Sequence, residues 1–239
     1  MLKRNLLYVV IVGLFFVTSA YSQKETKTVS KTIKPYSGKS FSLKNFFGEV
    51  IITGTDKNEV SIVAKISSKR GDAKKIVNDI DIRIDESSSS IDVETIIPKY
   101  LTKDRKDDNT EYNYNIDYTI SLPKKTSLKI DNSFCTTDIK DISSKVDVKN
   151  TFGKLVLKNI GGGLDIISEF GEMKINDVSG NISISNEFGT GKVKNITGNI
   201  EVKSNFGDIS IENVKGNINI KESDFSNVST KNVSGTVNK

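Results

Sequence analysis

The chain has 239 residues, of which 36% are hydrophobic and 27% charged, and its formal net charge is +5. It contains no His and a single Cys, which removes the commonest general base and metal ligand, Ser-His and Cys-His nucleophile pairs, thiolate metal clusters and any intramolecular disulfide. The composition therefore argues against most catalytic chemistry, and we expect no catalytic residue, cofactor or metal site.

Residues 1–22 have the layout of a secretory signal peptide. Lys3 and Arg4 precede a twelve-residue apolar run, and Ala20 and Ser22 occupy the −3 and −1 positions of a cleavage site before Gln23. The alternative is an uncleaved anchor, although the run is short for a membrane span. No second apolar run of about 18 residues follows, so we expect an exported chain without a transmembrane span, in the periplasm, at the cell surface or outside the cell.

Removal of this signal leaves 33 basic and 30 acidic residues, a net charge of +3. Lys alternates with Asp, Glu and Asn along the chain and forms no basic stripe with stacking aromatic residues. Nucleic-acid binding is therefore not expected.

The section from 23 to 131 is irregular and is predicted to belong to the same domain as the rest of the chain, where it could cap the first regular coil. Helical spacing of apolar residues is expected at 71–80, and alternation typical of strands at 80–84, 91–95 and 112–120. Between the last two strands, residues 99–111 form a charged loop. This least repetitive region is a tentative binding surface, with Asp104, Arg105, Tyr112 and Tyr114 as its candidate residues.

From residue 132 to 239 the chain repeats itself about every 18 residues. The repeat is marked by evenly spaced phenylalanines, with one extra residue before the last of them: Phe134, Phe152, Phe170, Phe188, Phe206 and Phe225. Apolar residues recur at fixed places after each Phe, and the unit contains two short alternating runs, each taking half of the period. This periodicity predicts an all-β fold, a β-helix or β-solenoid with 18-residue coils, preceded by an irregular β section with one short helix.

An antiparallel meander of nine-residue strands is the alternative fold. In a meander, nothing would restrict Phe to alternate turns. In stacked coils, each coil has one equivalent Phe position, so the solenoid is favoured. Six coils with strands about 4.8 Å apart would form a rod of about 29 Å.

Two side-chain ladders follow from stacked coils. The phenylalanines could form an exposed aromatic platform, but their phase with neighbouring apolar positions predicts a buried structural stack, in which Phe188→Ala would cost about 3 to 5 kcal/mol. Seven places after each Phe stands an Asn or Asp: Asp141, Asn159, Asp177, Asn195, Asn213 and Asn232. Four of these six are neutral, so hydrogen-bonded stacking at a corner is favoured over cation binding. Cys135 replaces the Gly that follows most of the phenylalanines and is interpreted as a small corner residue.

Over residues 30–239 the chain resembles the bacterial family of β-strand-repeat proteins called putative adhesins, also known as the toast-rack domain. The resemblance rests on Phe47-Gly48 with Val50 and Ile52, on the Ile-x-Leu-Pro element at 120–123, and on the Gly-x-apolar-x-apolar repeats that follow. It implies an exported, right-handed β-helix-like body with no catalytic residues. Cys135 and Ser226 depart from the Phe-Gly pattern, as terminal repeats commonly do.

The function predicted from these features is that of a non-catalytic, adhesin-like interaction scaffold at the cell surface or envelope, contacting an envelope protein or a glycan. Two alternatives remain open: an accessory or sensor module of an envelope-stress or regulatory system, and a polysaccharide-acting β-helix enzyme. The enzyme is disfavoured because the interval from Phe134 to Phe206 has no insertion to build a pocket. End-to-end self-association near Lys239 is a further expectation.

Overall fold

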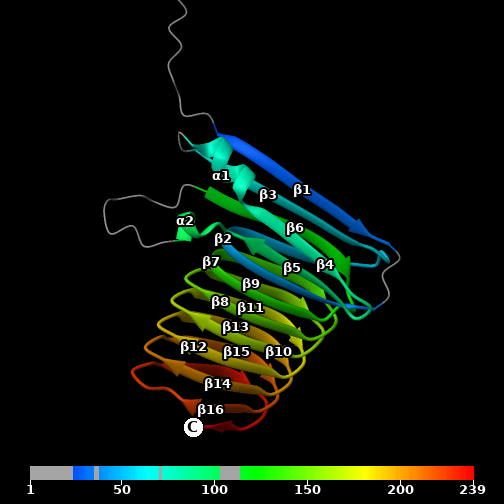
Figure 1. The fold of residues 1–239 in the computed structure, drawn as a ribbon. Coiled ribbons are helices and arrows are strands. Elements are labelled where there is room, and N and C mark those ends of the chain that lie inside the picture. The colour runs from blue at the N-terminus through cyan, green and yellow to red at the C-terminus, as the bar shows by residue number, and fades with distance from the viewer. Residues whose placement is uncertain (1–23, 35–37, 70–71, 103–113) are drawn as a thin grey trace, which may run out of the picture.

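A computed structural model describes residues 24–34, 38–69, 72–102 and 114–239, and these ranges form one continuous 18-stranded sheet. Figure 1 shows the sheet wound into a stack of coils that ends at the C-terminus, with the irregular section stacked on the other end. The predicted signal peptide lies outside the described residues. No helix in the described ranges is long and apolar enough to span a membrane.

The regular coils have two faces, and the strands within each face pair in parallel with those of the neighbouring coils. The first face contains β8 (Val146–Thr151), β10 (Leu164–Glu169), β12 (Ile182–Glu187), β14 (Ile200–Asn205), β16 (Ile218–Glu222) and β18 (Val237–Asn238). The second face contains β9 (Lys154–Ile160), β11 (Glu172–Ser179), β13 (Thr190–Thr197), β15 (Ile209–Lys215) and β17 (Val228–Val233). The longer strand β7 (Leu128–Ile142) bends around the corner and pairs with β8 and β9.

The pairing follows the repeat period of the sequence. Ile166 lies beside Ile184, and Ile184 lies beside Val202, each in a parallel ladder. These three side chains are buried, at 0 to 2% exposure, because inward positions alternate with outward ones along each strand. The β-solenoid prediction is confirmed, and the antiparallel meander is excluded.

The first coil precedes the regular repeats. Strand β2 (Ser40–Thr55) runs parallel to β7 in register, with Phe46 beside Ser133 and Gly48 beside Cys135. The Phe47-Gly48 pair is therefore a true corner of the solenoid, equivalent to the later Phe-Gly pairs.

The remaining N-terminal strands cover the outer edge of β2. On the first face lie β5 (Ser90–Ile96) and its antiparallel partner β4 (Asp81–Glu86). On the second face lie β6 (Tyr114–Pro123), β3 (Val60–Ser68) and β1 (Glu25–Ile33), of which β3 pairs antiparallel with both of its neighbours. The predicted helix is α1 (Ala73–Asp79), which packs against β1 and β3, and the segment predicted as a charged loop begins with the short helix α2 (Lys99–Thr102).

Candidate functional site: an exposed phenylalanine ridge

Each coil turns at two corners where a residue other than Gly has positive φ. One corner is a bend within the strands of the second face and carries the Asn or Asp of the predicted polar ladder, with φ between 55° and 62°. The other carries the repeated Phe, with φ between 50° and 57° in the six regular coils. Asn and Asp adopt this left-handed conformation with little strain, whereas a bulky aromatic residue rarely does. Both corners thus require a residue with positive φ, which is Asn or Asp at one corner and Phe at the other.

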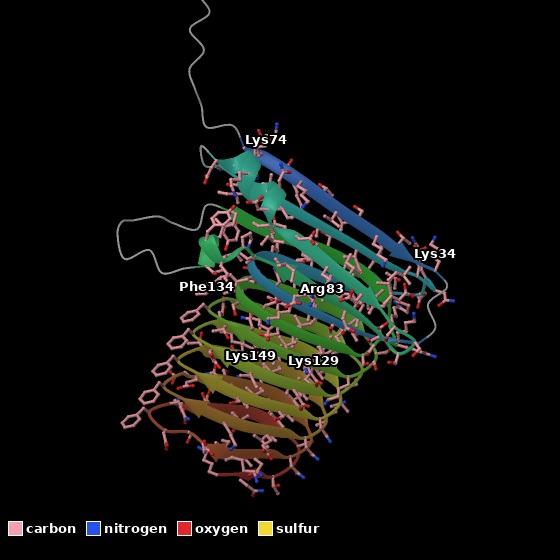
Figure 2. All side chains as sticks on the ribbon, in the orientation of Figure 1. Lys34, Lys74, Arg83, Lys129, Phe134 and Lys149 are labelled. Atoms are coloured by element: carbon pink, nitrogen blue, oxygen red, sulfur yellow. The ribbon has the colours of Figure 1, made fainter. Side chains whose placement is uncertain are left out.

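The phenylalanine side chains stack on one another along one edge of the solenoid. Consecutive ring centroids from Phe134 to Phe225 lie 4.7 to 5.1 Å apart, and the ring planes are inclined by 6 to 11°. Phe47 continues the stack at 5.0 Å from Phe134. Figure 2 shows the column of rings projecting from the edge that begins at Phe134.

This stack is exposed, so the prediction of a buried ladder is wrong. The five rings from Phe134 to Phe206 are 40 to 50% exposed, and Phe225 at the C-terminal end is 86% exposed. We name the six residues the phenylalanine ridge: Phe134, Phe152, Phe170, Phe188, Phe206 and Phe225. Stacking on both sides covers the ring faces from Phe134 to Phe206 and leaves their edges in contact with solvent, whereas Phe225 stacks on one side only.

The rings point outward because of the local backbone conformation at the corner. Alternation along β12 places Ile182, Ile184 and Asn186 inside, and its continuation would place Phe188 inside as well. The left-handed conformation at the corner interrupts this alternation, so Glu187 and Phe188 both point outward. The position of Phe188 in the sequence continues the inward alternation of β12, but its side chain points outward.

A buried ladder of small polar residues supports the phenylalanine corner from inside and was not predicted from the sequence. It lies two residues before each of the first five ridge phenylalanines and contains Asn132, Asn150, Ser168, Asn186 and Ser204. The Asn186 side-chain amide donates to the Gly189 carbonyl at 2.8 Å, and the Ser204 hydroxyl donates to the Gly207 carbonyl at 2.7 Å. These two bonds span the corners at Phe188 and Phe206, whereas Asn132 donates to the Thr137 hydroxyl at 2.8 Å instead. The recurrence of Asn or Ser at this place was the available signal.

The opposite corner behaves as predicted. The Asn195 amide donates to Asp177 at 3.0 Å, and the Asn213 amide donates to Asn195 at 3.0 Å. Asn159 donates to Asp141, and Asn232 donates to Asn213, in the same way. The predicted hydrogen-bonded stacking of the Asn and Asp residues is thus confirmed.

Acidic side chains border the C-terminal half of the ridge. Glu169, Glu187 and Asp224 each immediately precede a ridge Phe, and Asp208 follows Phe206 after one intervening Gly. None of these four carboxylates forms an ion pair with another described residue. The Asp208 carboxylate accepts a hydrogen bond from the Asn227 backbone N–H at 2.8 Å and lines a hollow together with Lys192. Glu172, which is also beside the ridge, is balanced by Lys154 at 3.6 Å and Lys174 at 2.8 Å.

The N-terminal end of the ridge adjoins a shallow hollow of about 430 Å³. Its lining includes Phe46, Thr95 and Lys149. Behind this lining, the Thr95 hydroxyl donates to the Asn45 side-chain oxygen at 2.8 Å and lies 2.7 Å from the Tyr118 hydroxyl. The lining also contains Lys44 and the carboxylates of Asp131 and Glu169, so Glu169 lies between this hollow and the C-terminal half of the ridge.

The tentative binding surface of the sequence analysis does not coincide with the ridge. Asp104, Arg105 and Tyr112 lie outside the described residues. Tyr114 is 4% exposed, and its ring packs edge-on against Phe47 with centroids 5.5 Å apart. Tyr114 is therefore a core residue and not part of a surface, because it begins the inward-facing row of β6.

Cys135 lies inside the corner beneath the first ridge Phe. Its thiol donates to the Ser133 carbonyl at 3.1 Å, and the Asn45 amide lies 3.5 Å from its sulfur. Burial raises the pKa of the Cys135 thiol to about 12. The neutral thiol is thus the stable form in the folded chain, and Cys135 is unsuited to nucleophilic or metal-binding roles.

This environment predicts a protected thiol. A thiol-specific reagent at pH 8 should label Cys135 slowly in the native protein and rapidly in denaturant. Because the folded-state pKa lies above the ordinary value of 9, the contribution of this group to stability is complete below pH 9 and is lost as the pH rises toward 12. Equal labelling rates with and without denaturant would contradict the buried position.

Because the ridge is exposed, replacing one of its phenylalanines should reduce the free energy of unfolding by less than replacing a buried one. Phe188 is 45% exposed and stacks on rings at 4.9 Å on both sides. Phe188→Ala should therefore cost about 2 kcal/mol, less than for a fully buried ring. Phe188→Asn should cost less than Phe188→Ala, because Asn adopts positive φ readily. Chemical denaturation of the two variants measures both values, and a loss above about 4 kcal/mol for Phe188→Ala would indicate a buried ring.

Comparison with known proteins gives structural neighbours only. No family model matches the chain, and no curated protein matches it. It is similar to the crystal structure of a "putative adhesin" from Bacteroides fragilis, at 14% identity and a TM-score of 0.49, over 89% of this chain and 96% of that one. It is also similar to a "putative cell adhesion protein" from Clostridium sporogenes, at 13% identity and a TM-score of 0.31, over 90% and 98% of the two chains. A "putative lipid binding protein" from Parabacteroides distasonis is similar at 14% identity and a TM-score of 0.32, over 89% and 96%.

Proposed function

We propose that the protein is an exported, non-catalytic scaffold that makes adhesive contacts at the cell envelope through its phenylalanine ridge. The observation that supports this proposal is the exposure of six aligned rings on a rigid body. Taking about 200 Å² for each ring, the exposed fractions amount to roughly 600 Å² of aromatic surface. Contiguous apolar patches of this size on soluble proteins commonly mark interaction sites.

The comparison of the two corners supports the same proposal. If only a left-handed corner were needed, Asn or Asp would suffice, as at the opposite corner of every coil. At the Phe corner an aromatic residue has a strained, left-handed backbone conformation and its ring is exposed to solvent. Such backbone strain is characteristic of functional positions. A scaffold of parallel coils holds these rings at fixed spacing without the loops that an enzyme pocket needs.

The proposal is tested by adhesion to cell-envelope preparations. The fluorescently labelled protein should bind envelope fragments saturably, and the triple variant Phe170→Asn/Phe188→Asn/Phe206→Asn should lose most of this binding while keeping its circular dichroism spectrum. Ile167→Asn is the matched control, because Ile167 is 46% exposed and lies outside the ridge. Equal binding by the triple variant and the parent would reject the ridge as the contact surface.

Export, the accessory-module alternative and end-to-end self-association stay predictions. Cleavage before Gln23 is read directly by N-terminal sequencing of protein recovered from the producing cell.

A further inference from the structure

We propose that the C-terminal half of the ridge binds a cationic amphipathic helix, a peptide segment whose apolar side chains are bordered by Lys or Arg. This inference rests on the proposed function, which it deepens by assigning the chemistry of the partner. It concerns the rings of Phe170, Phe188, Phe206 and Phe225 and the carboxylates of Glu169, Glu187, Asp208 and Asp224.

The stacked rings present mainly their edges along the C-terminal half of the ridge. From Phe170 to Phe225 the planes are inclined by only 6 to 7° at a spacing of 4.9 to 5.1 Å, so the rings cover each other's faces and the ridge offers ring edges along its length. Sugars stack on aromatic faces, and a cation is attracted to a ring face, so neither finds its usual contact between Phe134 and Phe206. Aliphatic side chains pack well against a row of edges.

The spacing of the rings along the ridge is closer to the repeat of a helix than to that of a strand. Rings recur every 4.7 to 5.1 Å. Side chains on one face of an α-helix recur about every 5.4 Å, whereas side chains on one face of a strand recur about every 6.7 Å. The spacing of apolar side chains along a helix is therefore closer to the spacing of the rings than the spacing along a strand is.

The side chains beside these rings include carboxylates that form no ion pair with a described residue. Four carboxylates without an ion-pair partner among the described residues border these rings on a chain whose formal net charge is +5. Lys or Arg beside the apolar row of a partner would meet these carboxylates. An anionic membrane surface or the same ridge of a second copy would instead bring like charges together, which disfavours both as the partner.

Three peptides, each long enough for about five helical turns, test the proposal by fluorescence anisotropy with the purified protein. The first is an amphipathic Leu/Lys helix, the second has Glu in place of every Lys, and the third has the Leu/Lys composition in an order without an apolar face. The Leu/Lys helix should bind at least tenfold more tightly than either of the others at low salt. Its advantage over the Leu/Glu helix should shrink in about 0.5 M NaCl.

Two sets of variants locate the binding site. Phe170→Asn/Phe188→Asn/Phe206→Asn should weaken binding of the Leu/Lys helix at least tenfold. Glu187→Gln/Asp208→Asn/Asp224→Asn should weaken it about tenfold at low salt and little at high salt. Glu201→Gln is a single-charge control on the exposed part of the first face, where Glu201 lies 3.9 Å from Lys221, and it should change the affinity less than twofold.

Equal affinity for the Leu/Lys and Leu/Glu helices, or unchanged binding by either triple variant, would overturn the proposal. Binding of phosphatidylcholine or phosphatidylglycerol vesicles through the ridge, without binding of the Leu/Lys helix, would also overturn it and would assign the ridge to lipid. If envelope adhesion depends on the ridge but no peptide binds, this inference fails and the proposed function stands. If adhesion is independent of the ridge, the proposed function fails whatever the peptides do.

Discussion

Gly207→Ala is expected to destabilise the protein by about 3 kcal/mol, because consecutive coils touch backbone to backbone beside the ridge. A Cβ atom at Gly207 would overlap the carbonyl oxygen of Gly189 and lie 2.8 Å from its carbonyl carbon. The atoms in the way are backbone atoms, so the conflict is relieved only by separating two coils and weakening their hydrogen bonds. Urea denaturation of the variant and the parent measures the loss.

Gly163→Ala provides the control for this prediction. The nearest atom to a Cβ at Gly163 is the Asn181 carbonyl oxygen at 3.3 Å, a contact that a small adjustment relieves. The loss at Gly163 should therefore stay below about 1 kcal/mol. If Gly207→Ala were as mild as Gly163→Ala, the close approach of successive corners would be contradicted.

Ile166→Ala is expected to cost about 3 to 4 kcal/mol, whereas the same change at the next residue, Ile167, should cost less than about 1 kcal/mol. Ile166 is 2% exposed between the side chains above and below it in the parallel ladder, and Ile167 is 46% exposed on the same strand. The pair has identical chemistry and differs only in the side of the strand it occupies.

Thermal and urea denaturation of the two variants checks this prediction. Similar losses at both positions would mean that β10 does not have one buried and one exposed side. A larger loss at Ile167 than at Ile166 would reverse the register, since a shift of one residue moves every side chain to the other face.

The sequence period was sufficient to predict the architecture. In-register coils put equivalent residues on top of one another, so an 18-residue repeat of apolar positions indicated both the solenoid and the columns of its core. The spacing of three between Val193 and Ile196 also revealed one corner, at Asn195, where the alternation skips a residue. The Asn and Asp ladder was predictable for this reason.

The phenylalanine corner was harder to predict because its sequence pattern conceals the break in alternation. Phe188 stands an even number of residues after Ile182 and Ile184, and an aromatic residue in that phase is expected inside. Its outward direction depends on a positive φ that an aromatic residue seldom adopts. The backbone conformation, and not hydrophobicity, decides the position of this ring.

The prediction that Tyr114 belongs to a binding surface was wrong for a different reason. Irregularity along the sequence does not indicate a surface here, because the inward row of β6 begins at Tyr114 itself. The ridge, in contrast, lies in the most regular part of the chain. Repetition here produces the candidate site, because one exposed residue per coil becomes a continuous surface when the coils stack.

The distance between two spin labels tests the stacked-coil account most directly. Lys129 and Asn219 are connected by five successive parallel pairings, through Asp147, Asp165, Ser183 and Glu201. With Cys135 replaced by Ser, labels at positions 129 and 219 should therefore be about 24 Å apart in a double electron–electron resonance measurement, five strand spacings of about 4.8 Å. A distance of about 48 Å, which nine-residue antiparallel strands would give, would contradict the solenoid.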